Sequence, residues 1–343
     1  MTPDPAAAPP PFRQVLPNLA AYRAEFVEGG AKLPLPPVPW SRDGLLAALP
    51  APPEGRRGWP WNIQTTPPTE PAAGWPKITI VTPSFKQGVF LEETLRSVLL
   101  QNYPDLEFIV MDGGSPDTSP AVIERYRPWL SFARVQRDRG QSHAINLGFS
   151  LGSGEIHGWI NSDDFYLPGA LHRVALAWLR GVDFVYGDGL ELDEVSGNML
   201  HTPAALARGR YVKFPGQLLS HATFWSAARH QPLWEEQHCA LDYELWIRLL
   251  PGLRTRHVNQ PLAVARRHEA AKTSNPAMKR QWTEDAARNG LAHPEIYQAN
   301  PWLDREYRLV QKCARRWRAR GETAKLEALR AECGWTAPIV SGG

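Results

Sequence analysis

The chain has 343 residues, a formal net charge of +3 and 43% hydrophobic residues. This length suits one large domain or two small ones, and the charge is too small to indicate nucleic acid as a partner. Three cysteines without CxxC spacing form neither a zinc signature nor a disulfide framework, so we expect a reducing, cytoplasmic setting. The first residues lack the pattern of a signal peptide, and no stretch approaches the ~20 apolar residues of a membrane span.

Residues 1–76 hold 18 of the 33 prolines, which favour extended backbone and exclude long helices. One short helix is predicted from Asn18, because Leu19, Tyr22 and Phe26 stand at helical spacing. Four tryptophans in this segment argue against disorder, in which aromatic residues are depleted. We therefore expect residues 1–76 to form an extended arm over the following domain.

From residue 77 the pattern alternates between strand and helix. Apolar and β-branched runs predict strands at 78–81, 106–111, 132–135 and 156–161, and helical spacing predicts helices at 91–100, 120–130 and 142–151. Such alternation is typical of an α/β fold that is Rossmann-like, with a mainly parallel central sheet and flanking helices.

The second half is less regular. It predicts strands at 184–186 and 221–225, a hairpin within 190–200, a helix at 242–250 and helices beyond 275. We expect a domain over 77–275, divided into halves at 77–165 and 166–275, and a helical extension over 276–343. The extension carries a row of arginines, Arg315, Arg316, Arg318 and Arg320, which suits either an anionic membrane surface or a solvated helix face.

Polar residues follow several of the predicted strands. Asp163 and Asp164 end the strand at 156–161, Asp112 ends the strand at 106–111, and a cluster at 138–141 follows the strand at 132–135. The carboxyl ends of parallel strands meet at one edge of a sheet, where ligands bind in open α/β folds. Two adjacent carboxylates suit a hard divalent cation shared with a phosphate, although either acid could instead cap the next turn.

Seven segments in this order resemble the inverting glycosyltransferases of family 2, of bacterial type, which have the GT-A fold. They are I-T-I-V-T-P-S-F at 78–85, V-M-D-G-G-S-P-D at 110–117, D-R-G-Q-S-H-A-I-N-L-G-F at 138–149, W-I-N-S-D-D at 159–164, V-Y-G-D at 185–188, A-L-D-Y-E-L-W-I-R-L at 240–249 and R-R-H-E-A-A-K-T at 266–273. The resemblance covers about residues 77–273. Each segment alone is weak evidence for the family, so the resemblance rests on their joint order and spacing.

The resemblance implies the residues that contact a nucleotide-sugar donor. They are Thr82, Pro83, Ser84, Phe85 and Asp112 for the base and ribose, then Asp138, Gly140 and Gln141, and finally Asn161 and Ser162 of the DxD-like motif. A carboxylate can accept hydrogen bonds from a uracil N–H or ribose hydroxyls, but Asp112 could also be a turn former before two glycines. His143 stands where many relatives have an acid.

The resemblance also implies a metal site made by Asp163, Asp164 and His268, with Mn²⁺ or Mg²⁺ as cofactor. Asn161 replaces the first acid of the motif, so the charge must come from the two aspartates. An imidazole ligand favours Mn²⁺, although His268 could equally be a surface histidine. Arg267 and Lys272 could pair with phosphate oxygens or form a solvated basic loop.

Asp242 is the expected general base, because the matching acid of the family deprotonates the acceptor hydroxyl. Its position at a predicted helix start also suits a helix cap. Glu244 ranks second, since two residues along a helix it points elsewhere. Asp188 lies either near the acceptor or in a turn between two glycines.

These features predict a metal-dependent, inverting hexosyltransferase that moves a sugar from a nucleotide-diphosphate sugar, with a UDP-sugar favoured, to a saccharide or lipid-linked acceptor, as in polysaccharide biosynthesis. Its expected place is the cytoplasm, with peripheral contact at the inner face of the membrane left open. A nucleotidyltransferase would release pyrophosphate instead, and a non-catalytic nucleotide- or carbohydrate-binding protein would bind donor without turnover. The sequence lacks HExxH, a phosphate-binding P-loop and a convincing G-x-G-x-x-G, which argues against a zinc hydrolase, a kinase and a dehydrogenase.

Overall fold

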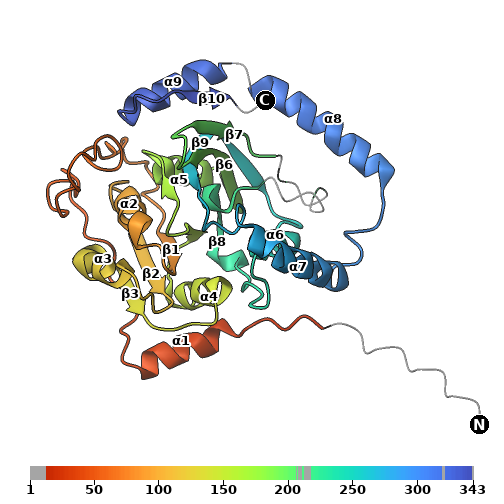
Figure 1. Cartoon of the computed structure of the whole chain (residues 1–343), viewed down its shortest axis with the longest axis horizontal. Coiled ribbons are helices and arrows are strands. Elements are labelled where there is room, and N and C mark those ends of the chain that lie inside the picture. The colour runs from red at the N-terminus through yellow and green to blue at the C-terminus, as the bar shows by residue number, and fades with distance from the viewer. Residues whose placement is uncertain (1–12, 206, 208–210, 212–217, 319–320, 342–343) are drawn as a thin grey trace, which may run out of the picture.

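A computed structural model describes residues 13–205, 207, 211, 218–318 and 321–341 (Figure 1). Its first half is a parallel sheet in the order β4-β1-β2-β3. These strands are β1 (Ile78–Ser84), β2 (Leu106–Asp112), β3 (Phe132–Val135) and β4 (Ile156–Trp159). The four strands expected in this half are therefore confirmed, and so is their parallel arrangement.

Helices cover both faces of this sheet. They are α2 (Gly88–Leu99), α3 (Ser119–Tyr126), α4 (Gln141–Leu151) and α5 (Ala170–Trp178), of which α5 was not predicted from the sequence. Ile80 packs in the core shared with α2, α3 and α5, whereas Val81 packs in the core shared with α4. Adjacent residues of a strand point to opposite faces, so each strand needs apolar side chains on both sides.

The second half of the sheet is mixed rather than mainly parallel. Strand β8 (Thr223–Ser226) pairs antiparallel with β4 and with β6 (Phe184–Asp193), and β6 pairs antiparallel with β7 (Met199–Thr202). Strand β9 (Thr255–Arg267) runs parallel to β6 and also pairs with the short β5 (Phe165–Tyr166). The predicted hairpin is confirmed as β6–β7, but the strand β9 was missed.

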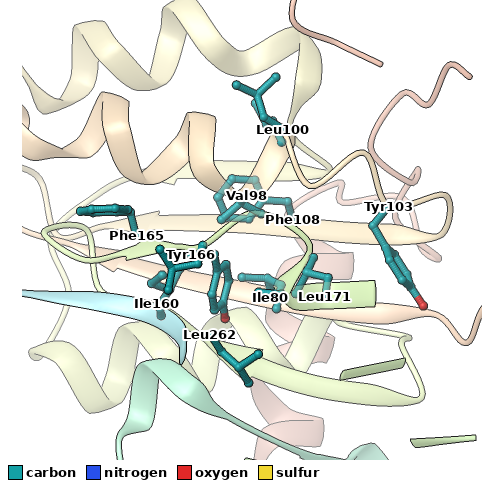
Figure 2. Packing of buried hydrophobic residues seen from close by; sticks show 14 of the residues in the cluster. Ile80, Val98, Leu100, Tyr103, Phe108, Ile160, Phe165, Tyr166, Leu171 and Leu262 are labelled. Carbon is teal, nitrogen blue, oxygen red and sulfur yellow. The ribbon is translucent and has the colours of Figure 1, made fainter. Parts of the chain in front are cut away.

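The larger core lies between the sheet and helices α2 and α5. Figure 2 shows Ile80 and Phe108 of the sheet beneath Val98 of α2, with Leu171 of α5 and Leu262 of β9 close by. These side chains are fully buried. Because β9 contributes Leu262 to this core, the two halves of the sheet share one apolar interior.

The Pro-rich N-terminal segment packs against the domain. Helix α1 (Leu19–Glu28), which Asn18 caps, contacts α4, and the following chain passes around the side of the sheet (Figure 1). Trp59 is buried and its indole N–H donates to the Tyr166 carbonyl at 2.6 Å. The fully buried Arg96 guanidinium donates to the carbonyls of Pro50, Pro60 and Trp61.

The chain beyond β8 is mostly helical apart from β9. It comprises α6 (Leu241–Leu249), α7 (Lys279–Ala292), α8 (Pro301–Arg318), α9 (Glu322–Glu332) and the short strand β10 (Ile339–Ser341), which joins β7. Within the described ranges, no helix combines the length and apolar character needed to span a membrane.

Candidate active site

The ends of β1 and β2 meet as expected, since Ser84 is paired with Asp112 in the sheet register. The Asp112 carboxylate is buried and accepts four hydrogen bonds, from the amides of Gly114 and Ser115 and from the hydroxyls of Ser84 and Ser115, at 2.7–3.0 Å. These bonds use the lone pairs of both oxygens, so Asp112 organises the turn that follows β2.

Phe85, Gly113 and Asp138 lie side by side at this sheet edge. A Cβ atom on Gly113 would lie 3.1 Å from Asp138 Oδ2 and 3.2 Å from the Phe85 ring. The absence of a side chain at Gly113 therefore leaves room between a ring that is 54% exposed and a carboxylate. Asp138 Oδ1 accepts from the Gly140 amide at 2.7 Å, and burial raises the pKa of the Asp138 carboxyl.

Gln141 links this loop to the end of β4. Its amide N–H donates to Asn161 Oδ1 at 2.7 Å, and its Oε1 accepts from Lys272 Nζ at 2.7 Å. The chain reaches α4 through Gly140, whose φ of +115° favours glycine. Gln141, Asn161 and Lys272 thus form one hydrogen-bonded group.

Asp163 and Asp164 point in different directions. Asp164 is buried, and its two oxygens accept from the Arg266 amide at 3.0 Å and from the Asn161 side chain at 3.1 Å. Burial and the neighbouring Asp163 charge raise the pKa of Asp164 well above its ordinary value. Asp163 is partly exposed, and its Oδ2 lies 3.1 Å from His268 Nε2.

His268 reaches Asp163 because it follows directly after β9. Its ring packs on Phe90 of α2 at 4.7 Å between centroids. The two preceding arginines alternate as strand residues do: Arg266 is buried in an ion pair with Glu93, whereas Arg267 is exposed and lies 3.2 Å from Glu191.

Asp163 and His268 are the pair that could hold a divalent metal. Among the described residues, no group of three or more His, Cys, Asp and Glu side chains is arranged to hold a metal ion. The expected trio does not assemble because Asp164 is occupied by Arg266 and Asn161. A carboxylate oxygen and an imidazole nitrogen nevertheless suit Mn²⁺, with phosphate oxygens and water as the remaining ligands.

Asp242 lies in the first turn of α6, where its Oδ1 accepts from the Tyr243 amide at 2.8 Å. Burial raises the pKa of Asp242, and the nearby Lys272 charge opposes that rise. Glu244, by contrast, is tied to Arg248 at 2.6 Å and to His293 at 3.1 Å. Although burial opposes the change, these bonds lower the pKa of Glu244 to about 2, so it acts as a structural anion.

The remaining predicted positions have structural partners. Thr94 Oγ1 donates to the Ser162 carbonyl at 2.9 Å, and His143 Nδ1 accepts from the Arg139 amide at 3.1 Å. Asp188 lies 2.9 Å from His257 Nε2 and 3.5 Å from His201 Nε2.

The first-strand residues Thr82 and Pro83 are both buried. The Thr82 hydroxyl has no hydrogen-bond partner in the described part of the chain. Sequence reasoning missed Phe90, whose ring supports His268, and Glu235, which binds Arg139 at 2.7 Å. No local motif marks either residue, because both act through chain-distant contacts.

The structure and the sequence were compared with those of known proteins. A crystal structure of TarS from S. aureus in complex with UDP superposes with a TM-score of 0.51 over 66% of this chain and 68% of that chain, at 16% sequence identity. The architecture, a curled mixed sheet flanked by helices, is therefore the GT-A fold.

Residues 79–234 match the model of the family described as glycosyl transferase family 2. A GalNAc(5)-diNAcBac-PP-undecaprenol beta-1,3-glucosyltransferase of Campylobacter jejuni is 26% identical over 51% of this chain and 60% of its own length. An uncharacterized glycosyltransferase of a Nostoc species is 27% identical over 35% of this chain and 41% of its own length. The chain thus carries a family 2 glycosyltransferase domain, and it spans about half the length of these relatives.

Proposed function

We propose that the chain is a metal-dependent, inverting glycosyltransferase that uses a nucleotide-diphosphate sugar, with a UDP-sugar as donor. The observation that carries the proposal is the pair Asp163–His268, which two chain-distant elements bring to the sheet edge where β1 and β2 also end. A carboxylate and an imidazole at that edge suit a divalent cation bound to a diphosphate.

The base of the donor fits between Phe85 and Asp138. The exposed Phe85 ring offers a face for stacking, and Asp138 keeps Oδ2 available beyond its bond to the Gly140 amide. A uracil N–H can donate to that oxygen. UDP is also the nucleotide bound to TarS, which shares the fold.

Asp242 is the proposed general base. It takes the proton from the acceptor hydroxyl while the hydroxyl oxygen forms a bond to the anomeric carbon, and the bond from that carbon to the diphosphate breaks on the opposite face. The configuration of the sugar inverts, and nucleoside diphosphate leaves. A metal ion held by Asp163 and His268 would neutralise the charge of the departing diphosphate as a Lewis acid.

The acceptor is proposed to be a saccharide or a lipid-linked saccharide. The relative from Campylobacter jejuni is described by its printed name as acting on a PP-undecaprenol-linked acceptor. On this proposal, the reaction takes place in the cytoplasm at the inner face of the membrane.

A comparison of Asp242→Asn, Asp163→Ala and the control Asp43→Asn tests the function. Donor-dependent release of UDP from UDP-sugars is followed with Mn²⁺, and Asp43 serves as control because it is an exposed acid of the N-terminal segment. We expect Asp242→Asn to bind donor but to lose activity by about 10²–10⁴-fold. Asp163→Ala should lose the metal-dependent part of donor binding.

Three outcomes would contradict the proposal. Full activity in both Asp242→Asn and Asp163→Ala would show that the proposed mechanism is wrong. Release of pyrophosphate would indicate a nucleotidyltransferase. Donor binding without turnover in the wild-type chain would indicate a binding protein.

A further inference from the structure

Helix α8 has two sharply different faces. Successive residues of an α-helix are turned by about 100°, so Tyr307 and Gln311 lie on one side, and both are buried. Two members of the arginine row noted in the sequence, Arg315 and Arg316, are exposed. Arg320 lies outside the described residues.

The opposite face of α8 combines cations with apolar side chains. Trp302 and Leu309 are 80% and 62% exposed, and the same arc carries five exposed basic residues: Arg305, Arg308, Lys312, Arg315 and Arg316. The described acids of this helix, Asp304 and Glu306, fall outside the arc and are only partly exposed. We call these seven side chains, together with the exposed Cys313, the α8 outer face.

The α8 outer face is arranged in two strips along the helix. At 100° per residue, Trp302, Leu309 and Cys313 form an apolar strip, and the five cations lie beside it on one flank. Figure 1 shows α8 along the periphery of the molecule, with this helix well outside the central sheet. Burial of a tryptophan ring is favourable, so the exposed Trp302 beside the exposed Leu309 leaves apolar surface that a partner could cover.

We propose that the α8 outer face docks the protein on an anionic lipid bilayer. The apolar strip enters the headgroup region, where tryptophan is favoured, and the flanking cations lie against the lipid phosphates. Lysine and arginine can lay their apolar stems along the interface while keeping their charges at the headgroups. The match of five positive charges, without an acid in the arc, to a negative surface selects anionic lipid as the occupant.

Docking goes beyond the proposed transfer reaction and does not depend on it. It concerns only α8, and it can be measured without donor, acceptor or metal. A negative result therefore overturns the docking and leaves the proposed sugar transfer standing.

Cys313 offers a direct probe on the apolar strip. Cys313 is exposed, whereas Cys239 and Cys333 are buried, so a thiol-reactive, environment-sensitive fluorophore labels the folded full chain at Cys313. We expect a blue shift with vesicles of phosphatidylcholine and phosphatidylglycerol but not with phosphatidylcholine alone. The shift should decrease as salt rises, because exposed charges are screened. Unlabelled Cys313→Ser protein in a vesicle sedimentation assay checks that the label does not cause binding.

Charge and apolar variants separate the two contributions. Each cation near an anionic surface contributes about fivefold in binding, so Arg305→Gln with Arg316→Gln should weaken binding roughly 20-fold. Trp302→Ala should weaken binding even at low salt. Arg280→Gln is the matched control, because Arg280 is 90% exposed on α7 and outside the face.

The proposal is overturned by any of three results: no blue shift with anionic vesicles, equal binding to both vesicle types, or equal binding by Arg280→Gln and the double variant. Displacement of the protein from anionic vesicles by duplex DNA at equal phosphate concentration would instead identify a general polyanion site.

Discussion

Two neighbouring aspartates at the end of β4 serve different purposes. Asp164 turns inward and joins the end of β4 to β9 through the Arg266 amide, whereas Asp163 turns outward to His268. Burial and then the proximity of the Asp163 charge raise the pKa of Asp164, since a buried carboxyl and a neighbouring like charge both disfavour the ionised form. The inward acid supports the strand end, and the outward acid is the one that the proposed function assigns to the metal.

Asp164→Ala should therefore destabilise the fold, and Asp163→Ala should not. Removal of the Asp164 carboxyl leaves the Arg266 amide and the Asn161 side chain without their acceptor, at a cost of about 2–4 kcal/mol. Asp163→Ala should change the free energy of unfolding by less than about 1 kcal/mol, because Asp163 is partly exposed. Urea unfolding of both variants measures the difference, and equal losses would contradict the separate roles.

The pH dependence of transfer should report on Asp242. Burial raises the pKa of this carboxyl above its ordinary value of 3.8, and a base must be deprotonated to act. The rate should therefore fall on the acid side at a pH above the usual range of aspartate. Lys272→Met removes a charge that lowers this pKa, so kcat/KM should begin to fall at a higher pH than in the wild type. If the acid side of the kcat/KM profile lies at the same pH in Lys272→Met as in the wild type, the titrating group is not Asp242.

The sequence predicted that Asp163 and Asp164 lie at a strand end, but it did not predict that one side chain points inward and the other outward. Adjacent carboxylates after an apolar run predict a site at a strand end from local pattern alone. Which acid turns inward depends on the Arg266 amide, which is 102 residues away in the sequence. No spacing rule contains that contact.

At the scale of elements, helix α1 braces the loop that precedes α4. The Tyr22 hydroxyl accepts from Arg139 at 2.6 Å and donates to Glu235 at 2.8 Å, and Arg139 is also paired with Glu235. Burial and the bond to Glu235 raise the pKa of Tyr22 to about 12, so the hydroxyl remains a donor. The braced loop carries Asp138, which makes α1 a positioning element for the proposed donor site.

Tyr22→Phe should weaken donor binding and leave catalysis nearly unchanged. Loss of two hydrogen bonds worth about 1 kcal/mol each allows the loop to move, so KM for the donor should rise roughly 5- to 30-fold while kcat stays within about twofold. Arg23→Gln is the control, because Arg23 binds the Ser150 carbonyl at the other end of α4. A fall in kcat with unchanged KM would place the brace in the chemical step instead.

The elements that sequence reasoning missed share a physical cause. Strand β9 includes Pro261, and proline usually argues against a strand, but here it pairs with Asp188 at a shift in register where a regular ladder bond is absent. Strands β1, β2 and β4 of the first half were predictable because they are buried on both faces and read as apolar runs, whereas the edge strand β3 is only partly buried. Strand β9 brings His268 to Asp163, so this contact could not be predicted without the path of β9. Only the family resemblance suggested that His268 belongs to the site.

At the scale of the whole molecule, the two extensions of the chain meet. The Trp59 amide donates to the Cys333 carbonyl at 2.8 Å, and β10 adds to the edge of β7. The N-terminal segment and the C-terminal helix α9 therefore support each other across the side of the sheet. The attachment of α9 therefore depends on contacts with both the N-terminal segment and the sheet.

A buried histidine should make the attachment of α9 sensitive to pH. His201 of β7 lies between Glu322 of α9, at 2.7 Å, and Asp188 of β6, at 3.5 Å, and His257 of β9 is also bound to Asp188. Burial alone would lower the pKa of His201, but the two carboxylates raise it above 6.5. Because the folded pKa is raised, the stabilisation is complete below pH 6.5 and is lost as the pH rises through the folded value.

His201→Gln should remove this part of the pH dependence. The wild-type free energy of unfolding should fall as the pH rises above 6.5 and through the raised pKa of His201, and the fall should be smaller in His201→Gln and in Glu322→Gln, since either change breaks the charged pair. Arg280→Gln, which disrupts a largely exposed pair on α7, should keep the wild-type pH profile, because exposed pairs contribute little. Protection of the α9 amides from hydrogen exchange locates the effect: it should weaken at high pH in the wild type. Equal pH profiles in all four proteins would show that His201 does not hold α9 through its charge.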